Sequence, residues 1–366
     1  MKLSAFKAEL SKALVAREAE VEAFALALIA KEHIFFFGPP GVAKSFLCSS
    51  VAEIIGASYY EVLMTKFSEP DDVFGPVAIS GLKQDRYFRN IQGRLPTVQL
   101  GFVDEIFKAN AGIINALLTI MQERKFDNDG QRVDCPLHTL AAASNEWPEP
   151  GELDALFDRF LIRKMVKPVP TKDRQRLVFG DIGKPDPIAT MDEINAAHEA
   201  AMKLEFTKDA QDCYFEIAAT LEQNDIRPGD RRLRKCANLC KAKAKLDDNM
   251  AVHPRHLAVL GDSMWTRHEQ AEQATEIVQR IAFPELQKLN DIALSLADIA
   301  DHMPNTTEGY TTALGKLDEL LKDSKQVEGL PQGQDLISEI NKQKIIVGAK
   351  MFGVSEEAAQ KLVAAT

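Results

Sequence analysis

The sequence has no long hydrophobic run, no excess of basic residues and only five cysteines. A membrane-spanning helix needs roughly 18–20 apolar residues. The stretch that comes nearest, Val21–Ala30, is shorter and holds Glu22. The first residues, Met1–Ser4, lack the pattern of a secretory signal. We therefore expect neither a membrane span nor export.

The cysteines are scattered and odd in number, which indicates free thiols and a reducing, cytoplasmic setting. Cys236 and Cys240 are spaced to share a helix face, and His253 and His256 follow them. Pro254 separates the two histidines, and no second Cys/His pair has zinc-like spacing. We do not expect a metal site of this kind.

Acidic residues outnumber basic ones by 54 to 44, giving a net charge of −10. This balance argues against general binding of nucleic acid, although a local basic patch stays compatible with it. A length of 366 residues suits two or three domains, and 45% hydrophobic with 27% charged residues is ordinary for a soluble protein.

Residues 38–45 read Gly-Pro-Pro-Gly-Val-Ala-Lys-Ser, directly after the apolar run Ile34–Phe37. A buried strand, a glycine-bearing loop, and a lysine and hydroxyl that open a helix form the order that cradles a nucleotide triphosphate. Lys44 is predicted to reach the β- and γ-phosphates, and Ser45 to bind Mg²⁺. The expected nucleotide-binding residues are Gly38, Pro39, Pro40, Gly41, Val42, Ala43, Lys44, Ser45 and Phe46.

Ala43 stands where the usual pattern has a second glycine. A Cβ disfavours positive φ, so we expect an ordinary backbone angle at this position. The alternative reading of the segment is a strand-to-helix turn that happens to contain a lysine.

Adjacent carboxylates, Asp104 and Glu105, end the expected third strand, where α/β sheets place ligands. Asp104 is predicted to hold Mg²⁺ through water, and Glu105 to polarise the attacking water as general base. Two neighbouring acids are common in any loop, so the reading depends on the preceding phosphate loop. Asn145 follows the next strand and is predicted to position the same water; its alternative is a turn residue or N-cap.

Arg159 closes a short expected helix at an edge from which its own phosphates are out of reach. It is predicted to act as an arginine finger on the nucleotide of a neighbouring subunit, with Arg163 as the second candidate. The alternative is a surface ion pair with Asp158 or Asp154.

The helix that Pro228–Arg232 opens carries seven cationic residues between 231 and 245. Positive residues in a first helical turn oppose the helix dipole, which favours an anionic partner. Arg231 is predicted to touch the γ-phosphate of a nucleotide held by the first domain. Lys241, Lys243 and Lys245 are expected to form a solvated face, and nucleic-acid binding by this helix is the alternative.

Strand and helix patterns alternate up to about residue 168, which predicts an α/β class with a mostly parallel sheet. Strands are expected at 34–37, 59–63, 98–103 and 140–143, helices at 3–31, 44–55, 111–122 and 152–160, a hairpin at 125–133, and irregular structure over 65–97. Residues 190–268 read as helices only, and a further helical segment breaks near Pro304-Asn305 and Gly329–Gly333. The expected domains are 1–180, 185–268 and 269–366.

In this order, the motifs resemble those of AAA+ ATPases, and more narrowly the RavA-type branch of the MoxR family. The resemblance covers roughly residues 1–268 and includes Ala43, which RavA-type relatives share. The segments that carry it are Phe37–Ser45, Leu63–Ser68, Val73–Pro76, Val103–Ile106, Asn115–Leu118, Ala141–Glu146, Ala155–Arg163 and Asp230–Arg232.

The resemblance implies an α/β core with an all-helical lid, Mg²⁺-dependent ATP hydrolysis and a homo-hexameric ring. It also implies a partner with a von Willebrand factor A domain and the maturation of client proteins. A helix insertion at about 66–97 would face the pore or one ring surface, making Tyr87 and Phe88 candidate client contacts; packing within the insertion is the alternative. RavA-type proteins carry a longer C-terminal part, and residues 269–366 match nothing that we can name.

Three other functions stay open at this stage. A nucleic-acid motor shares the same core, but no attached DNA-binding motif is present. A GTP switch would need an Asn-Lys-x-Asp motif, and Asn341–Lys344 lacks the aspartate. An activator of one metabolic enzyme, such as a Rubisco activase, belongs to the same class of motor.

Overall fold

The computed structural model describes residues 3–147, 151, 153–180, 183–302, 306–325, 327 and 331–352. The chain divides into two compact units, Met1–Val278 and Gln279–Thr366. The expected break at Pro304-Asn305, and residues 329–330 of the second expected break, lie outside the described residues.

Five parallel strands form the central sheet of the first unit, in the order β2-β3-β6-β1-β7. The strands are β1 (His33–Phe37), β2 (Tyr59–Leu63), β3 (Leu100–Asp104), β6 (Thr139–Ser144) and β7 (Phe160–Met165). The first four confirm the predicted strands and the predicted α/β class. The apolar side chains of β1, β3 and β6 are largely buried on both faces, as a parallel sheet covered by helices requires, whereas Leu63 of the edge strand β2 is 59% exposed.

The strand β7 was not predicted from the sequence. The short helix was expected to end at Phe160, but α7 covers Asp154–Arg159 and Phe160 begins β7. The run Phe160–Ile162 is fully apolar and pairs with β1. No turn residue separates it from the helix, which is why the helix pattern was extended over it.

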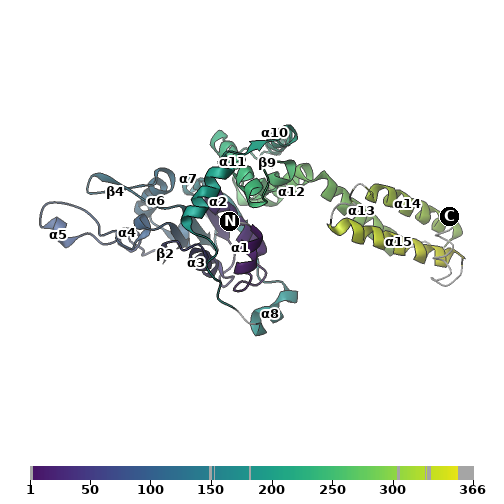
Figure 1. The fold of residues 1–366 in the computed structure, drawn as a ribbon, viewed down its shortest axis with the longest axis horizontal. Helices are drawn as coiled ribbons and strands as arrows, with labels where there is room; N and C mark the ends of the chain where they lie inside the picture. The colour runs from purple at the N-terminus through teal and green to yellow at the C-terminus, as the bar shows by residue number, and fades with distance from the viewer. Residues whose placement is uncertain are drawn as a thin grey trace. The chain divides into compact units, whose positions relative to one another are not determined.

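Helices pack against the central sheet. The expected helical stretch at 3–31 consists of two helices, α1 (Leu3–Leu10) and α2 (Glu18–Ala30), and α2 contacts β1 and β7. The remaining core elements are α3 (Lys44–Ile54), η2 (Ile106–Lys108), α6 (Ala111–Glu123), η3 (Thr171–Asp173) and α8 (Arg174–Phe179). Figure 1 shows α8 projecting from the edge of the core.

The predicted hairpin is confirmed as β4 (Lys125–Asn128) paired with β5 (Gln131–Asp134). Asp129 and Gly130 both have positive φ, the conformation that a tight hairpin turn requires. The insertion before it contains only α4 (Pro70–Phe74), α5 (Ile79–Leu82) and η1 (Leu95–Thr97). Arg86 Nε donates to Asp129 Oδ2 at 2.8 Å, and Asn128 Oδ1 accepts from the Arg89 N–H at 2.7 Å, so the insertion and hairpin form one assembly.

The next part of the first unit is mainly helical, with α9 (Met191–Met202), α10 (Lys208–Gln223), α11 (Asp230–Leu246), η4 (Pro254–Asp262) and η5 (His268–Gln270). The prediction of helices only was wrong at two places. Glu205–Phe206 (β8) and Ala251–Val252 (β9) form a short parallel pair.

The helix α12 (Ala271–Ala282) spans the boundary between the units. The second unit contains α13 (Pro284–Asp301), α14 (Thr307–Ser324) and α15 (Pro331–Phe352), which confirms a helical C-terminal segment and places Gly333 inside a helix. Its apolar core includes Leu289, Ile292, Leu296, Leu317, Ile340 and Val347. None of the described helices in either unit has the length and hydropathy needed to cross a bilayer.

Candidate nucleotide site

Two glycines shape the loop that follows β1. A Cβ on Gly38 would lie 2.3 Å from the carbonyl oxygen of Val166, so only glycine fits between β1 and the end of β7. Gly41 has a φ of +79°, which also favours glycine. The loop then leads directly into α3, so its backbone and the helix N-terminus face the same space.

Ala43 differs from the sequence-based expectation. Its φ of 64° and ψ of 30° lie in the left-handed region, although it carries a Cβ. It is the N-cap of α3, and its carbonyl accepts the first helical hydrogen bond from the Leu47 N–H at 3.0 Å. The loop geometry and the helix start together impose a conformation that costs roughly 1–2 kcal/mol for an L-residue.

Lys44 folds back over the loop. Its Nζ donates to the carbonyl oxygens of Gly38 at 2.6 Å and Pro39 at 3.1 Å. Burial lowers the pKa of Lys44, while the nearby carboxylates of Asp104 and Glu105 act in the opposite direction. The ammonium group is therefore held beside both acids, whereas Ser45 and Phe46 are exposed at the start of α3.

Asp104 and Glu105 lie at the carboxyl end of β3. Asp104 Oδ1 accepts the Glu105 N–H at 3.0 Å, and Glu105 has a φ of 52° that turns its side chain out of the strand line. Glu105 Oε2 is buried and lies 3.3 Å from Lys108 Nζ, an ion pair without hydrogen-bond geometry. This oxygen is free to accept a hydrogen bond from water.

Asn145 follows β6, which lies between β1 and β3 in the sheet. The pairing of Phe37 with Ser144, and of Val103 with Ala142, brings the ends of these three strands to one edge. The amide oxygen of Asn145 is buried and has no hydrogen-bond partner among the described residues. The edge thus joins Lys44, two carboxylates and an unsatisfied amide, a donor set that fits a magnesium triphosphate.

A cavity of about 390 Å³ opens beside the phosphate loop. Its lining comes from the loop itself, from Arg17, and from Val169, Arg174 and Leu177 around α8. The cavity could not be predicted from the sequence because its walls come from three segments that no short motif joins.

Arg159 is the last residue of α7, and its side chain is 20% exposed. Its terminal nitrogen lies 3.5 Å from Asp158 Oδ2, so the ion pair set against the finger reading is present. Its Nε is buried and has no hydrogen-bond partner in the part of the chain that the structure describes. Burial, and then the charge of Arg231, lower the pKa of Arg159, which places Arg231 of the exposed first turn of α11 close to it.

Arg163 is not a surface residue. It is 2% exposed, and it donates to the carbonyl oxygens of Phe160 and Phe157, each at 3.1 Å, and of Trp265. Its guanidinium lies 4.0 Å from the centre of the Phe157 ring. Burial lowers the pKa of Arg163 well below its usual value. This packing excludes the earlier second candidate for a finger that reaches another subunit.

The expected solvated lysine face on α11 is wrong. Lys241, Lys243 and Lys245 are all half-buried. Lys243 Nζ pairs with Glu22 at 2.6 Å and with Asp247 at 3.0 Å, so this lysine fastens α11 to α2. Aliphatic lysine stems pack against neighbouring helices while the charged ends find partners.

Comparison with known proteins identifies the family. Residues 1–202 match the family described as the MoxR domain in the MoxR-vWA-beta-propeller ternary systems, and residues 210–278 match an AAA lid domain. The chain belongs to the MoxR family of AAA+ ATPases.

Some relatives of this MoxR-family chain match most of its length, and others match about half of it. The protein MJ0812 of Methanocaldococcus jannaschii is 31% identical, with 90% of this chain and all of the relative covered. Chaperone MoxR1 of Mycobacterium tuberculosis is 28% identical, covering 49% of this chain and 44% of its own. A crystal structure of a candidate ATPase from Cytophaga hutchinsonii has a TM-score of 0.62 at 16% identity, covering 76% of this chain and 93% of that one, which supports the AAA+ fold.

Proposed function

We propose that this MoxR-family chain hydrolyses ATP in a homo-hexameric ring and uses the energy to remodel or mature client proteins. The observation that carries the proposal is the meeting of Lys44, Glu105 and Asn145 at one edge of the sheet, beside a phosphate loop. Placement within the RavA-type branch remains part of this proposal.

When bound, ATP supplies the phosphoanhydride bond, and the charge of Mg²⁺ draws electron density from that bond. The loop N–H groups and Lys44 would bind the phosphates, while Ser45 and Asp104 would hold the metal. Glu105 Oε2 accepts a proton from the attacking water, and the Asn145 amide orients that water. The two buried oxygens without hydrogen-bond partners support these roles.

The cavity beside the loop is proposed to hold the nucleoside. Its volume of about 390 Å³ and its mixture of Val169, Leu177 and the cations Arg17 and Arg174 suit an apolar base and a phosphate-bearing sugar.

Two arginines complete the proposed site. Arg231 reaches the γ-phosphate of its own subunit, and Arg159 reaches the nucleotide of the next. The charge of Arg231 lowers the pKa of Arg159, so an anionic phosphate beside either arginine offsets their repulsion. The hexamer supplies the second half of the site.

A partner with a von Willebrand factor A domain is proposed because the matching family is described by its systems with such a domain. The name of the relative MoxR1 as a chaperone supports work on protein clients. Within the insertion, Tyr87 is 59% exposed and suits client contact. Phe88 packs against Gly81, where an added Cβ would lie 2.5 Å from its ring, so the packing alternative describes Phe88 better.

The direct test combines turnover and capture. Glu105→Gln should bind ATP and lose Mg²⁺-dependent release of phosphate, whereas Lys44→Ala should lose binding. The Glu105→Gln protein, loaded with ATP, should retain clients and a von Willebrand factor A partner that the Lys44→Ala protein does not. Nuclease-sensitive recovery of DNA-processing proteins would point instead to a nucleic-acid motor.

A further inference from the structure

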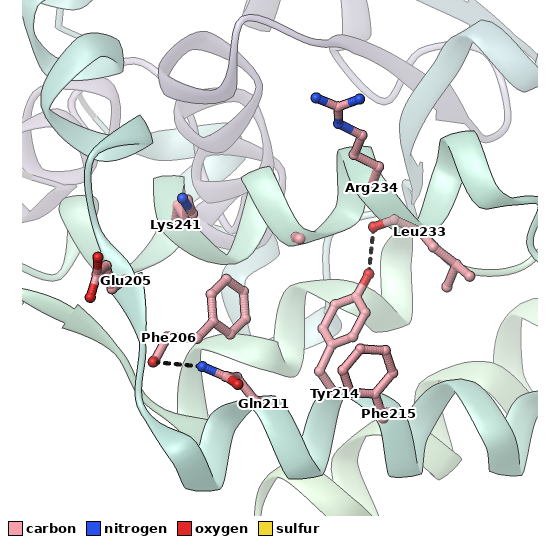
Figure 2. A pocket seen from close by; sticks show the side chains of 9 residues that line it. Glu205, Phe206, Gln211, Tyr214, Phe215, Leu233, Arg234 and Lys241 are labelled. Carbon is pink, nitrogen blue, oxygen red and sulfur yellow. Dashed lines mark hydrogen bonds between the residues drawn. The ribbon is translucent and has the colours of Figure 1, made fainter.

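A second cavity, of about 540 Å³, lies between α10, α11 and β8, in the lid (Figure 2). Its wall is largely aromatic and aliphatic, with Phe206, Tyr214, Phe215 and Leu233. Phe215 is 71% exposed, so a large apolar ring stands at the mouth of the cavity. Such a surface has no use in the nucleotide chemistry described above.

The uncharged polar side chains of this wall already have hydrogen-bond partners. Tyr214 donates its hydroxyl to the Leu233 carbonyl at 2.6 Å, and Gln211 Nε2 donates to the Phe206 carbonyl at 3.2 Å; Figure 2 shows both bonds. A small-molecule site needs converging polar groups that orient its ligand. This wall instead offers apolar contact, which suits the side chain of a polypeptide.

The edge of the cavity is cationic, although the chain as a whole is acidic. Arg234 and Lys241 both line it from α11, and Glu205 is the one carboxylate among the described lining residues. Arg234 is exposed and makes no hydrogen bond or ion pair with any described residue. Lys241 Nζ donates only to the Met202 carbonyl, at 3.1 Å, within the described part of the chain.

The other cations of α11 show that this placement is specific. Lys235 pairs with Glu32 at 2.6 Å, Lys243 pairs with Glu22, and Arg232 is buried against Asp158. Arg231 lies near Arg159. Arg234 and Lys241 are thus the cations that this helix places beside the aromatic cavity.

We propose that the lid cavity docks an acidic segment of a partner protein, with one aromatic or large aliphatic side chain inserted beside Phe206, Tyr214 and Phe215. Acidic residues that flank this anchor pair with Arg234 and Lys241. The anchor supplies most of the affinity and the charges supply selectivity, as at other interfaces with a central apolar contact.

The test is a selection of short random peptides displayed on phage against the full-length protein. Phe215→Ala and Arg234→Glu proteins serve as counter-selection targets. The expected winners are acidic and carry one aromatic or large aliphatic residue. Failure to enrich peptides, or winners without acidic bias, would overturn the proposal.

The winning peptide, labelled with fluorescein, then reports affinity by anisotropy. Phe215→Ala and Arg234→Glu should each weaken binding about tenfold or more, and added salt should weaken it further. Matched controls are Phe179→Ala, another exposed phenylalanine, and Arg227→Glu, an exposed lid arginine paired with Asp225; neither should change the affinity.

Thermal unfolding checks that the variants remain folded. Because the readout is peptide binding, the experiment does not depend on ATP hydrolysis. Equal binding by wild type, Phe215→Ala and Arg234→Glu would overturn the proposal. A single-stranded oligonucleotide or a phosphatidylserine vesicle that binds through Phe215 and Arg234, where the peptides do not, would overturn it as well.

Discussion

Arg232 of α11 donates two hydrogen bonds to one carboxylate oxygen of Asp158, at 3.2 and 3.0 Å. The same guanidinium also donates to the carbonyl oxygens of Asp158 at 2.9 Å and Ser263 at 2.7 Å. Arg232 is 3% exposed, so one side chain joins the lid to α7 and β7. The arginine next to it in sequence, Arg231, is exposed.

Removal of this contact should loosen the lid. Arg232→Met keeps the side-chain volume but leaves Asp158 and several carbonyl groups without their donor. We expect a loss of about 2–4 kcal/mol in the free energy of unfolding, measured by urea titration. Arg227→Met, at a 75% exposed position, should change stability by less than about 0.5 kcal/mol. Equal effects of the two substitutions would contradict the role of Arg232.

The left-handed Ala43 predicts a stabilising substitution. Ala43→Gly removes the steric cost of the Cβ at a φ of 64°, and this gain exceeds the added entropy of an unfolded glycine. We expect the free energy of unfolding to rise by about 1 kcal/mol, with nucleotide affinity retained. Ala52→Gly, inside α3, is the matched control and should lower stability. A lower melting temperature for Ala43→Gly would contradict the strain.

The loss of folding stability at acidic pH should come in part from His138. Burial, and then the charges of Lys31 and Arg124, lower the pKa of His138 to about 3, and no described residue forms a hydrogen bond with its Nε2. The pKa of a histidine in an unfolded chain is about 6.5. Between these two values the unfolded chain binds the proton and the folded chain does not, so stability falls as the pH drops.

His138→Gln should flatten this dependence. The slope of unfolding free energy against pH between the two pKa values should decrease by up to roughly 1.4 kcal/mol per pH unit, the contribution of one proton. His33 is also buried with a lowered pKa, so part of the slope should remain. An unaltered slope for His138→Gln would show that this histidine is not held neutral.

The two compact units predict where the chain can be shortened. Ala274 and Val278 of α12 are fully buried, and Thr275 Oγ1 donates to the Gly261 carbonyl at 3.2 Å, so α12 belongs with the lid up to Val278. A chain that ends at Ala282 should stay folded and keep its basal ATPase activity. A chain that ends at His268 should expose this apolar surface and lose stability in calorimetry. The reverse order of stability would contradict this boundary.

The parts predicted from the sequence were local in the chain. The phosphate loop, Asp104 and the Asn128–Gly130 turn each depend on neighbouring residues and on a strand or helix pattern around them. Arg163 and Arg232 could not be assigned in this way because their partners lie on other elements, Trp265 in one case and Asp158 in the other. Ala43 was misjudged because the tertiary loop geometry overrides its local steric preference.

The role of Arg159 as an arginine finger also depends on a partner that is distant in the sequence, because a single chain contains only half of the proposed site. Arg159→Ala should bind ATP and lose turnover, and Lys44→Ala should lose both. If Arg159 acts on the next subunit, a mixture of the two inactive proteins forms some interfaces with an intact loop on one side and an intact arginine on the other. Random head-to-tail assembly makes these about a quarter of all interfaces.

Phosphate release by the mixture should therefore recover to a clear fraction of the wild-type rate. Glu105→Gln mixed with Lys44→Ala is the matched control. Glu105 acts within its own subunit, so no interface of that mixture joins an intact loop to an intact base, and activity should stay low. Recovery only in the mixture with Arg159→Ala would assign this arginine to the neighbouring nucleotide. Full activity of Arg159→Ala alone, or no recovery on mixing, would leave Arg159 as the partner of Asp158 seen at 3.5 Å.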